Sequence, residues 1–296
     1  MSDAARFRTI SFLSDLGTAD ESVGLVHAVV RDLAPHVTVV DLTHQVPAYD
    51  VRAGSLALAR AVGYVPSGVI LAAVDAGPEQ DRPWVAIEVA GGEGVLVGPD
   101  NGLLAPAVAM AGGAERAVLL TNEGFHLASP GGPFPVRDVL APVAAALCNG
   151  VDLMELGTPV EADVLLPGTV PLPRDAEGGG VTADVLWVNR AGDCQLNIGL
   201  DDLQPWGGDL GAKLMVQAGD VTRVAERVVH AGQLGTGSIG LAVDPFGMLA
   251  LVLSRRSAAE ELQLVANDQV VLRPLDEADR GQGGVTSAVQ LQPRRG

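Results

Sequence analysis

The sequence predicts an α/β protein of two domains, in which an N-terminal α/β domain with a largely parallel central sheet precedes a smaller C-terminal all-β barrel domain. Three observations predict it. Short apolar runs alternate with helical patterns over the first half of the chain, a stretch rich in proline and glycine follows, and the remaining apolar runs are short and bounded by turn residues. We therefore expect a domain at 1–165, a linker at 166–180 and a domain at 181–296.

In the first domain, continuous β-branched runs predict strands and amphipathic stretches predict helices. The expected strands cover residues 9–14, 37–43, 68–74, 84–90, 94–98 and 116–121. The expected helices cover residues 21–34, 51–65 and 137–150. Thr18 and Glu21 predict a capping box ahead of the first helix. Strands of this kind joined by helices are typical of a parallel sheet that is covered on both faces.

In the second domain, turn residues separate short strands that are rich in valine and leucine. The expected strands cover residues 181–189, 212–219, 238–244, 247–253 and 268–275, with one short helix at 257–264. This spacing is typical of a small antiparallel barrel or sandwich.

Composition excludes several classes of function. A net charge of −17 argues against a nucleic-acid surface, which needs clustered lysine and arginine. No run approaches the roughly 18 apolar residues of a membrane span, so we expect no membrane partner. Cys148 and Cys194 are far apart, which favours a reduced, cytoplasmic chain. The histidines at 27, 36, 44, 126 and 230 lack metal-ligand spacing, so we expect no metal site.

Two strand ends carry candidate chemistry, because ligands of open α/β sheets collect beyond the carboxyl ends of the strands. Asp15 follows the first expected strand, and its carboxylate can accept two hydrogen bonds from a vicinal diol such as a ribose; the alternative is a turn cap. Asp75 ends the third strand, and Arg82 follows seven residues later. If the Gly77-Pro78 turn folds back, the pair can hold and polarise a water; the alternative is a structural salt bridge.

The stretches "FLSDLGTADESVG", "VVDLTHQVPAYDVRAG", "VDAGPEQDR", "VGPDNGLL" and "RDVLAPVAAAL" carry a resemblance to a known family. They occur in the order and at the spacing of the S-adenosylmethionine (SAM) hydroxide adenosyltransferases, relatives of the fluorinase and chlorinase. The resemblance spans nearly the whole chain and is strongest over residues 9–148. It implies an N-terminal α/β domain, a C-terminal barrel, and a homotrimer whose active sites lie between subunits.

The chemistry that this resemblance implies is substitution at the 5′ carbon of SAM, with methionine leaving and no cofactor. Asp15 matches the residue that binds the ribose hydroxyls, and Tyr49 matches an aromatic position of the nucleoside pocket. Asp75 and Arg82 match two members of the catalytic Asp-Arg-His set that handles water. Halogenating relatives typically have a tyrosine at the first of these positions. The resemblance therefore implies hydrolysis of SAM to adenosine and methionine.

The sequence departs from the family at two places. Pro135 of "FPVRD" stands where the family has the histidine of "FHGRD", and Val136 offers a halide no side-chain donor. His126, nine residues upstream, lies at a variable family position. In the second domain, Asn189 and Asp193 have exchanged the family's acid and amide at the methionine end of the substrate, whereas Asn197 still matches.

Three functions remain open on the sequence. The first is SAM hydrolysis by Asp75 and Arg82. The second is adenosyl transfer to another nucleophile such as a halide, which the altered "FPVRD" loop motivates. The third is a non-catalytic or very slow homologue that binds SAM or adenosine, which Pro135 and the Asn189/Asp193 exchange motivate.

Overall fold

The computed structural model describes residues 5–77, 82–129, 131–168, 170–204 and 206–275. The chain divides into two compact units, Met1–Val170 and Pro171–Gly296. The boundary between them falls inside the Pro/Gly-rich stretch at 166–180. Two residues of that stretch, Arg174 and Asp175, form a short strand that pairs with the second unit.

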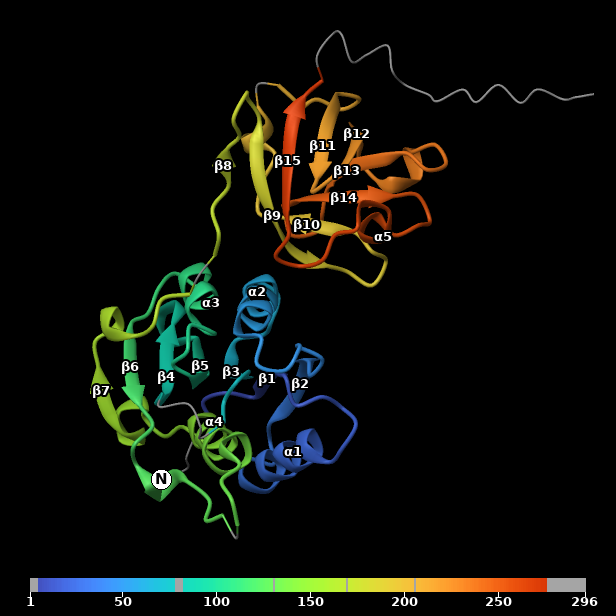
Figure 1. Cartoon of the computed structure of the whole chain (residues 1–296). Helices are drawn as coiled ribbons and strands as arrows, with labels where there is room; N and C mark the ends of the chain where they lie inside the picture. Colours follow the sequence, from blue (N-terminus) through green and yellow to red (C-terminus); the bar gives the residue numbers. More distant parts are fainter. Residues whose placement is uncertain (1–4, 78–81, 130, 169, 205, 276–296) are drawn as a thin grey trace, which may run out of the picture. The chain divides into compact units, whose positions relative to one another are not determined.

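The first unit is built on a seven-stranded sheet in the order β2-β1-β3-β5-β4-β6-β7 (Figure 1). Its strands are β1 (Thr9–Ser14), β2 (Thr38–Thr43), β3 (Gly68–Ala73), β4 (Trp84–Val89), β5 (Gly94–Pro99), β6 (Arg116–Leu119) and β7 (Thr158–Val160). Strands β2, β1, β3 and β5 run parallel to one another, whereas β4 pairs antiparallel with both β5 and β6. All six residues of β3 are buried, as expected of a central strand with helices on both sides.

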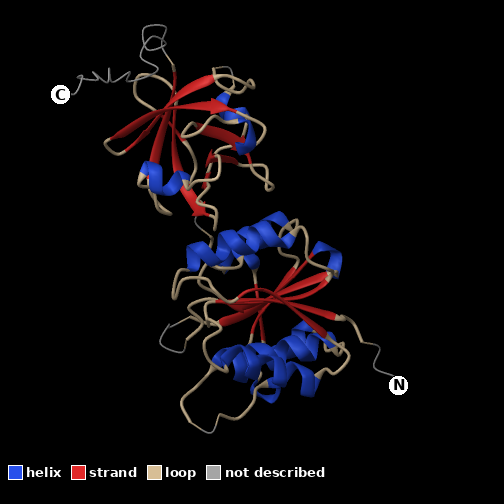
Figure 2. Ribbon diagram, turned by 90° about the vertical axis from the view of Figure 1, so that its right-hand side faces the viewer, coloured by secondary structure: helices blue, strands red, loops and turns tan. Residues whose placement is uncertain are grey.

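Helices cover both faces of this sheet (Figure 2). They are α1 (Ser22–Leu33), α2 (Val51–Val62), α3 (Ala105–Met110) and α4 (Ala141–Cys148), with a π-helical turn, η3 (Val136–Leu140), leading into α4. The core under α1 and α4 is separate from the core under α2 and α3. Short helical turns complete the chain: η1 (Ala90–Gly92), η2 (Glu123–Phe125), η4 (Leu153–Leu156), η5 (Ala162–Val164), η6 (Asp201–Leu203) and η7 (Ala231–Gln233).

The second unit is a barrel closed by β9, β10, β14, β13, β12, β11 and β15, with β8 added beside β9. Its elements are β8 (Arg174–Asp175), β9 (Val181–Val188), β10 (Cys194–Leu196), β11 (Lys213–Ala218), β12 (Val221–Arg227), β13 (Ile239–Val243), β14 (Leu249–Leu253), α5 (Ala258–Leu262) and β15 (Gln269–Pro274). The pairings are antiparallel except between β12 and β13. The predicted fold class, a largely parallel α/β domain followed by a smaller barrel, is confirmed.

The start of α1 differs from the expectation. The predicted capping box of Thr18 and Glu21 was wrong, because Glu21 is the N-cap residue and its side chain makes no capping hydrogen bond. The Thr18 hydroxyl instead accepts a hydrogen bond from Nε2 of Gln45 over 2.9 Å. Thr18 thus bonds to a residue 27 positions away in the sequence instead of capping α1.

A buried carboxylate, Glu88 on β4, ties the N-terminal segment to the sheet. Only 4% of Glu88 is exposed, and its carboxylate pairs with Arg116 of β6 and, over 2.6 Å, with Arg6. Hydrogen bonds from Arg116, and then from Arg6, lower the pKa of Glu88 to about 2 against the opposing effect of burial. The carboxylate is therefore held ionised among three segments of the chain.

Candidate functional site

The carboxyl ends of β1 and β3 meet through the side chain of Asp15. Its Oδ2 accepts hydrogen bonds from the backbone N–H groups of Tyr49, over 3.0 Å, and Asp75, over 3.1 Å. The backbone N–H of Asp15 in turn donates to the carbonyl of Ala73 on β3. One carboxylate oxygen thus joins the end of β1, the loop before α2 and the end of β3, and it brings together three of the residues that the sequence predicted.

Tyr49 and Asp75 both have left-handed backbones, with φ of 64° and 51°. Residues other than glycine rarely adopt this conformation, and it costs about 1–3 kcal/mol where it is enforced. The two hydrogen bonds to Asp15 oppose that cost. Tyr49 is 76% exposed, so its ring is open to a partner, whereas Asp75 is half-buried.

Asn101, which follows β5, completes this edge of the sheet and was not singled out from the sequence. Its Nδ2 donates to the carbonyl of Val74 over 3.0 Å and of Asp75 over 3.4 Å, while its Oδ1 accepts from the N–H of Leu103. The signal was present, because asparagine next to glycine in a turn commonly bonds to the backbone nearby. Asn101 therefore positions the backbone on which Asp75 stands.

Arg82 lies exposed two residues before the start of β4. Since β4 pairs antiparallel with β5, its first residue, Trp84, lies opposite Pro99 at the end of β5. The N–H of Asp100 donates to the carbonyl of Pro83 over 2.9 Å, so Arg82 enters at the same edge as Asp75. The predicted fold-back of Gly77 and Pro78 involves residues 78–81, which lie outside the described residues.

A cavity of about 400 Å³ lies beside this edge, where β4 begins and η3 starts. Its lining includes His126, Asp138, Trp84 and Pro135. The fold therefore places His126 and Pro135 on one cavity, although nine residues separate them in the sequence. The Nε2 atom of His126 is buried without a hydrogen-bond partner among the described residues, and burial lowers the pKa of the imidazole.

Asp138 and Arg137 hold the loop that forms this cavity. Asp138 accepts a hydrogen bond from the N–H of Phe134 over 3.0 Å and pairs with the guanidinium of Arg137 over 2.6 Å. Burial by itself raises the pKa of Asp138, but its hydrogen bonds with Arg137 and the Phe134 backbone outweigh that effect and lower it. Pro135 and Val136 are buried at the start of η3.

In the second unit, Asn189 and Asp193 line a cavity of about 310 Å³ together with Trp187, Gln195 and Asp244. The exchanged amide and acid contact each other, because Nδ2 of Asn189 donates to Oδ2 of Asp193 over 2.9 Å. Oδ1 of Asn189 also accepts from the N–H groups of Ala191 and Asp193. The two side chains therefore form one fixed polar group on the cavity wall.

Asn197 lies elsewhere in the same unit, and only 6% of it is exposed. Its Oδ1 accepts from the N–H of Asp184 over 2.7 Å, and its Nδ2 donates to the carbonyl of Pro171 over 2.9 Å. Through these two bonds the Asn197 amide connects β9 with the segment before β8. Asn197 is not among the described residues that line the cavity around Asn189.

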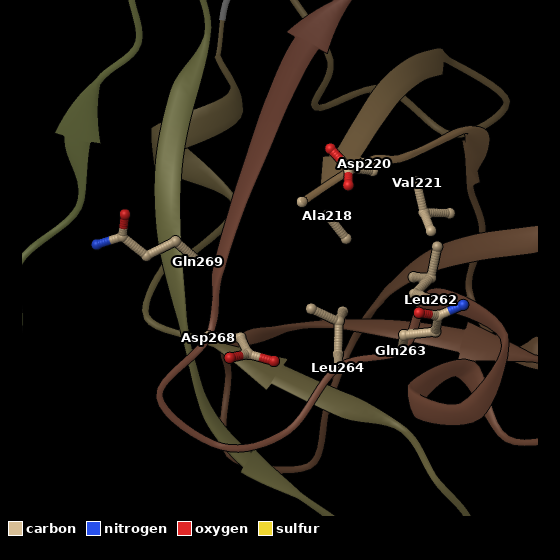
Figure 3. A pocket seen from close by; sticks show the side chains of 9 residues that line it. Ala218, Asp220, Val221, Leu262, Gln263, Leu264, Asp268 and Gln269 are labelled. Carbon is tan, nitrogen blue, oxygen red and sulfur yellow. The ribbon is translucent and has the colours of Figure 1, made fainter.

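A further cavity of about 330 Å³ opens where β11, α5 and β15 approach one another (Figure 3). Its polar side chains come from Asp220, Gln263, Asp268 and Gln269. None of the site residues predicted from the sequence is among its lining, so it carries no part of the predicted chemistry.

The fold also gathers His27 of α1, Asp41 of β2 and His44 just after β2. Each residue offers one possible ligand atom, and the three atoms all lie within 4.8 Å of one another. Sequence spacing alone predicted no metal site, because these residues come from a helix, a strand and a loop and show no recurrent interval.

Comparison with known proteins shows which family this chain resembles. Residues 10–157 match the model of the SAM hydroxide adenosyltransferase N-terminal domain. The chain is 41% identical over 261 residues to a protein from Salinispora tropica named (R)-S-adenosyl-L-methionine hydrolase, with 88% of this chain and 96% of that protein covered. It is 26% identical over 284 residues to a fluorinase from an Actinoplanes species, with 87% and 94% covered.

A solved structure extends the likeness to the fold. The crystal structure of an uncharacterized conserved protein from Thermotoga maritima matches with a TM-score of 0.80 at 27% identity and covers 89% of this chain and 99% of its own. None of the helices in the described part of the chain has the length and hydrophobicity that a transmembrane span needs.

Proposed function

Because this chain belongs to the SAM hydroxide adenosyltransferase family, we propose that it hydrolyses S-adenosyl-L-methionine to adenosine and L-methionine. The observation that carries the proposal is the junction at Asp15, where one carboxylate oxygen holds the backbones of Tyr49 and Asp75. The residues that would hold the nucleoside and the water are thereby fixed relative to one another, as a reaction between two positioned partners requires.

The reaction needs a positioned water and an acceptor for its proton. A water oxygen attacks the 5′ carbon, the new C–O bond forms as the C–S bond breaks, and the electron pair of that bond passes to sulfur. The sulfonium thus leaves as the neutral thioether of methionine and needs no proton from an acid. The carboxylate of Asp75 takes the proton from the water, and the guanidinium of Arg82 stabilises the hydroxide character that develops.

Binding of the ribose falls to Asp15 in this proposal. A carboxylate offers about four acceptor sites, and backbone N–H groups occupy two of them. The remaining capacity can accept bonds from the two ribose hydroxyls, while the exposed ring of Tyr49 supplies an apolar surface for the nucleoside. SAM is the substrate here, and we propose that the reaction uses no cofactor.

Recognition of the methionine end is assigned to Asn189, Asp193 and Asn197 on the family resemblance. The same resemblance implies a homotrimer whose active sites lie between subunits, and we propose this assembly for the chain. Light scattering on the eluting protein should give three chains per particle. Mixing an Asp75→Asn variant with an Asn189→Ala variant after dissociation should restore part of the activity, because some mixed trimers would contain one intact site. A monomeric particle, or a mixture that recovers no activity, would contradict an active site shared between subunits.

The experiment that tests the activity is product analysis in water enriched in ¹⁸O. The purified chain should release adenosine labelled at the 5′ oxygen, together with methionine. Asp75→Asn should lower kcat by about 10²- to 10⁴-fold, the range for loss of an acid-base group. Asp32→Asn, at an exposed position of α1, serves as the matched control and should turn over as the parent does. Unlabelled or absent adenosine contradicts the proposal.

Two rival functions are outcomes of the same experiment. Adenosyl transfer to a halide would give a 5′-halo nucleoside that depends on added chloride or fluoride; buried Val136 supports no such product. The buried Pro135 in place of the family's histidine favours slow turnover. Calorimetry that detects SAM binding while no adenosine forms would instead assign this chain to the non-catalytic SAM- or adenosine-binding function.

The location that we propose is the cytoplasm. Cys148 and Cys194 are both free and buried, as a reducing compartment would leave them. Fractionation of cells that produce the protein at its natural level should recover it with the cytoplasmic marker enzymes, and recovery in a secreted fraction would contradict this proposal.

A further inference from the structure

We infer that His27, Asp41 and His44 form a binding site for one divalent first-row transition cation, with Zn²⁺ as the representative ion. The inference rests on the geometry of the cluster and is independent of the proposed function. Two imidazoles and a carboxylate are ligands that Zn²⁺ accepts, whereas Mg²⁺ and Ca²⁺ prefer oxygen ligands.

The distances fit a shared ion. Oδ1 of Asp41 lies 2.9 Å from Nε2 of His27 and 3.0 Å from Nε2 of His44, and all three ligand atoms lie within 4.8 Å of one another. Ligands that are each about 2.0–2.2 Å from one ion are separated by about 3 to 3.5 Å. The two distances from Asp41 already match that spacing to within a few tenths of an ångström. The ligand atoms of the two histidines lie at most 4.8 Å apart, so binding would bring them closer by no more than about 1.3 to 1.8 Å.

His44 shows the need for a partner most clearly. Its side chain is only 4% exposed, and its Nε2 has no hydrogen-bond partner among the described residues although the carboxylate lies 3.0 Å away. Its other ring nitrogen, Nδ1, lies 2.8 Å from the Oγ of buried Ser14. Donation from Nδ1 to Ser14 leaves a lone pair on Nε2, which is the tautomer that binds a metal.

Packing fixes the imidazole ring of His44 and borders that of His27. The ring of Phe12 is fully buried and contacts His44 edge-on, with the centroids 4.6 Å apart, while the His27 centroid lies 6.3 Å from that of Phe12. A bulge in the pairing of β1 with β2 follows Asp41, since Phe12 lies opposite Asp41 but Leu13 lies opposite Thr43. Such a bulge re-aims side chains along a strand, which allows Asp41 and His44 to reach the same point.

Access also suits a cation. The side chains of His27 and Asp41 are 35% and 43% exposed, which leaves solvent a path to the open coordination positions. The ion would join α1 to the end of β2, next to the turn that carries Asp15.

The test is titration of the full chain, free of any affinity tag and previously dialysed against a chelator, with Zn²⁺ alone. Calorimetry should give one ion per chain for the parent. His27→Ala and Asp41→Asn should bind at least about 100-fold more weakly, because each removes a ligand, and Ser14→Ala about 10- to 100-fold more weakly, because it releases the orientation of His44. His230→Ala, at an exposed histidine of the second unit, should bind as the parent does.

A second measurement guards against variants that fail to fold. Zn²⁺ should raise the thermal midpoint of the parent, because a ligand that binds the folded state stabilises it, and should leave the midpoint of His27→Ala unchanged. Mg²⁺ should leave the thermal midpoints of both proteins unchanged. The inference is overturned if the parent binds no Zn²⁺, or if His27→Ala and Asp41→Asn bind it as tightly as the parent. Adenosine formation by the chelator-treated protein reports on the proposed function separately.

Discussion

The backbone N–H of Asp75 donates a hydrogen bond to Oδ2 of Asp15 over 3.1 Å. The residue assigned to the water is thus held in place by the residue assigned to the ribose. A change at Asp15 should therefore affect both binding and catalysis, because it removes a nucleoside contact and frees the backbone beneath Asp75.

Asp15→Ala should destabilise the protein and abolish measurable turnover. It leaves the N–H groups of Tyr49 and Asp75 without their acceptor. The N–H of Tyr49 is exposed and can turn to water, whereas that of Asp75 is part-buried, and an unsatisfied buried donor costs about 1–3 kcal/mol. Asp15→Asn retains one acceptor oxygen and should cost less stability, while still losing activity. Urea unfolding of both variants, alongside SAM turnover, provides the measurement. Equal stability of the two variants would show that the hydrogen bonds to Oδ2 contribute nothing.

Tyr49→Gly should separate stability from substrate binding. The backbone at Tyr49 has φ of 64°, which glycine adopts at no steric cost. Relief of that strain should offset the greater entropy of the unfolded chain, so the free energy of unfolding should stay within about 1 kcal/mol of the parent. The KM for SAM should rise because the ring is lost. Tyr49→Ala should raise the KM as much as Tyr49→Gly does, but without the relief of backbone strain. If both variants keep the KM of the parent, the ring of Tyr49 does not contact the substrate.

Glu88→Gln should make stability less dependent on pH. The pKa of Glu88 is about 2 in the folded chain against 4.5 ordinarily, so its ion pairs stabilise the protein above pH 4.5 and lose that effect as the pH falls toward 2. The shift corresponds to roughly 3 kcal/mol at neutral pH. The parent and the variant should therefore converge in stability as acid is added, which unfolding curves between pH 7 and the acid limit would check. A constant difference would contradict the assignment.

Cys148 and Cys194 should resist thiol reagents in the folded protein. Burial raises the pKa of each thiol to about 12, so the reactive thiolate is scarce and the sulfur is shielded. Each lies in the core of a different unit, so labelling in increasing urea, followed by mass spectrometry of the two peptides, should report the unfolding of each unit separately. Rapid labelling without denaturant would contradict the burial of that thiol.

The main elements of the fold could be predicted because their signals are local. Strand β3 is a continuous apolar run in which every residue is buried, and such runs are typical of central parallel strands. Strand β12 was not predicted, because Thr222, Arg223 and Val224 are exposed and leave little alternation to recognise. The π-helical turn ahead of α4 was also hidden, since its residues fit an ordinary helix.

The candidate site could be predicted only in part, because only some of its signals are local in the sequence. Asp15 and Asp75 each follow an apolar strand, which is visible in the sequence. That one oxygen of Asp15 serves both Tyr49 and Asp75 depends on two left-handed backbones, which no local pattern specifies. The cluster of His27, Asp41 and His44 depends on the packing of α1 beside β2. The roles of all seven predicted site residues remain predictions: Asp15, Tyr49, Asp75, Arg82, Asn189, Asp193 and Asn197.

The left-handed turn at Asp75, with φ of 51°, also limits how this chain could diverge. Aspartate tolerates this conformation better than most residues other than glycine, and Tyr49, with φ of 64°, shows that this chain can also enforce it on a tyrosine, at a cost of about 1–3 kcal/mol. Replacement of Asp75 by the tyrosine typical of halogenating relatives would therefore add a backbone cost to the change in chemistry. In this lineage, such an exchange would lower the stability of the fold, so stabilising substitutions elsewhere in the chain would favour its retention.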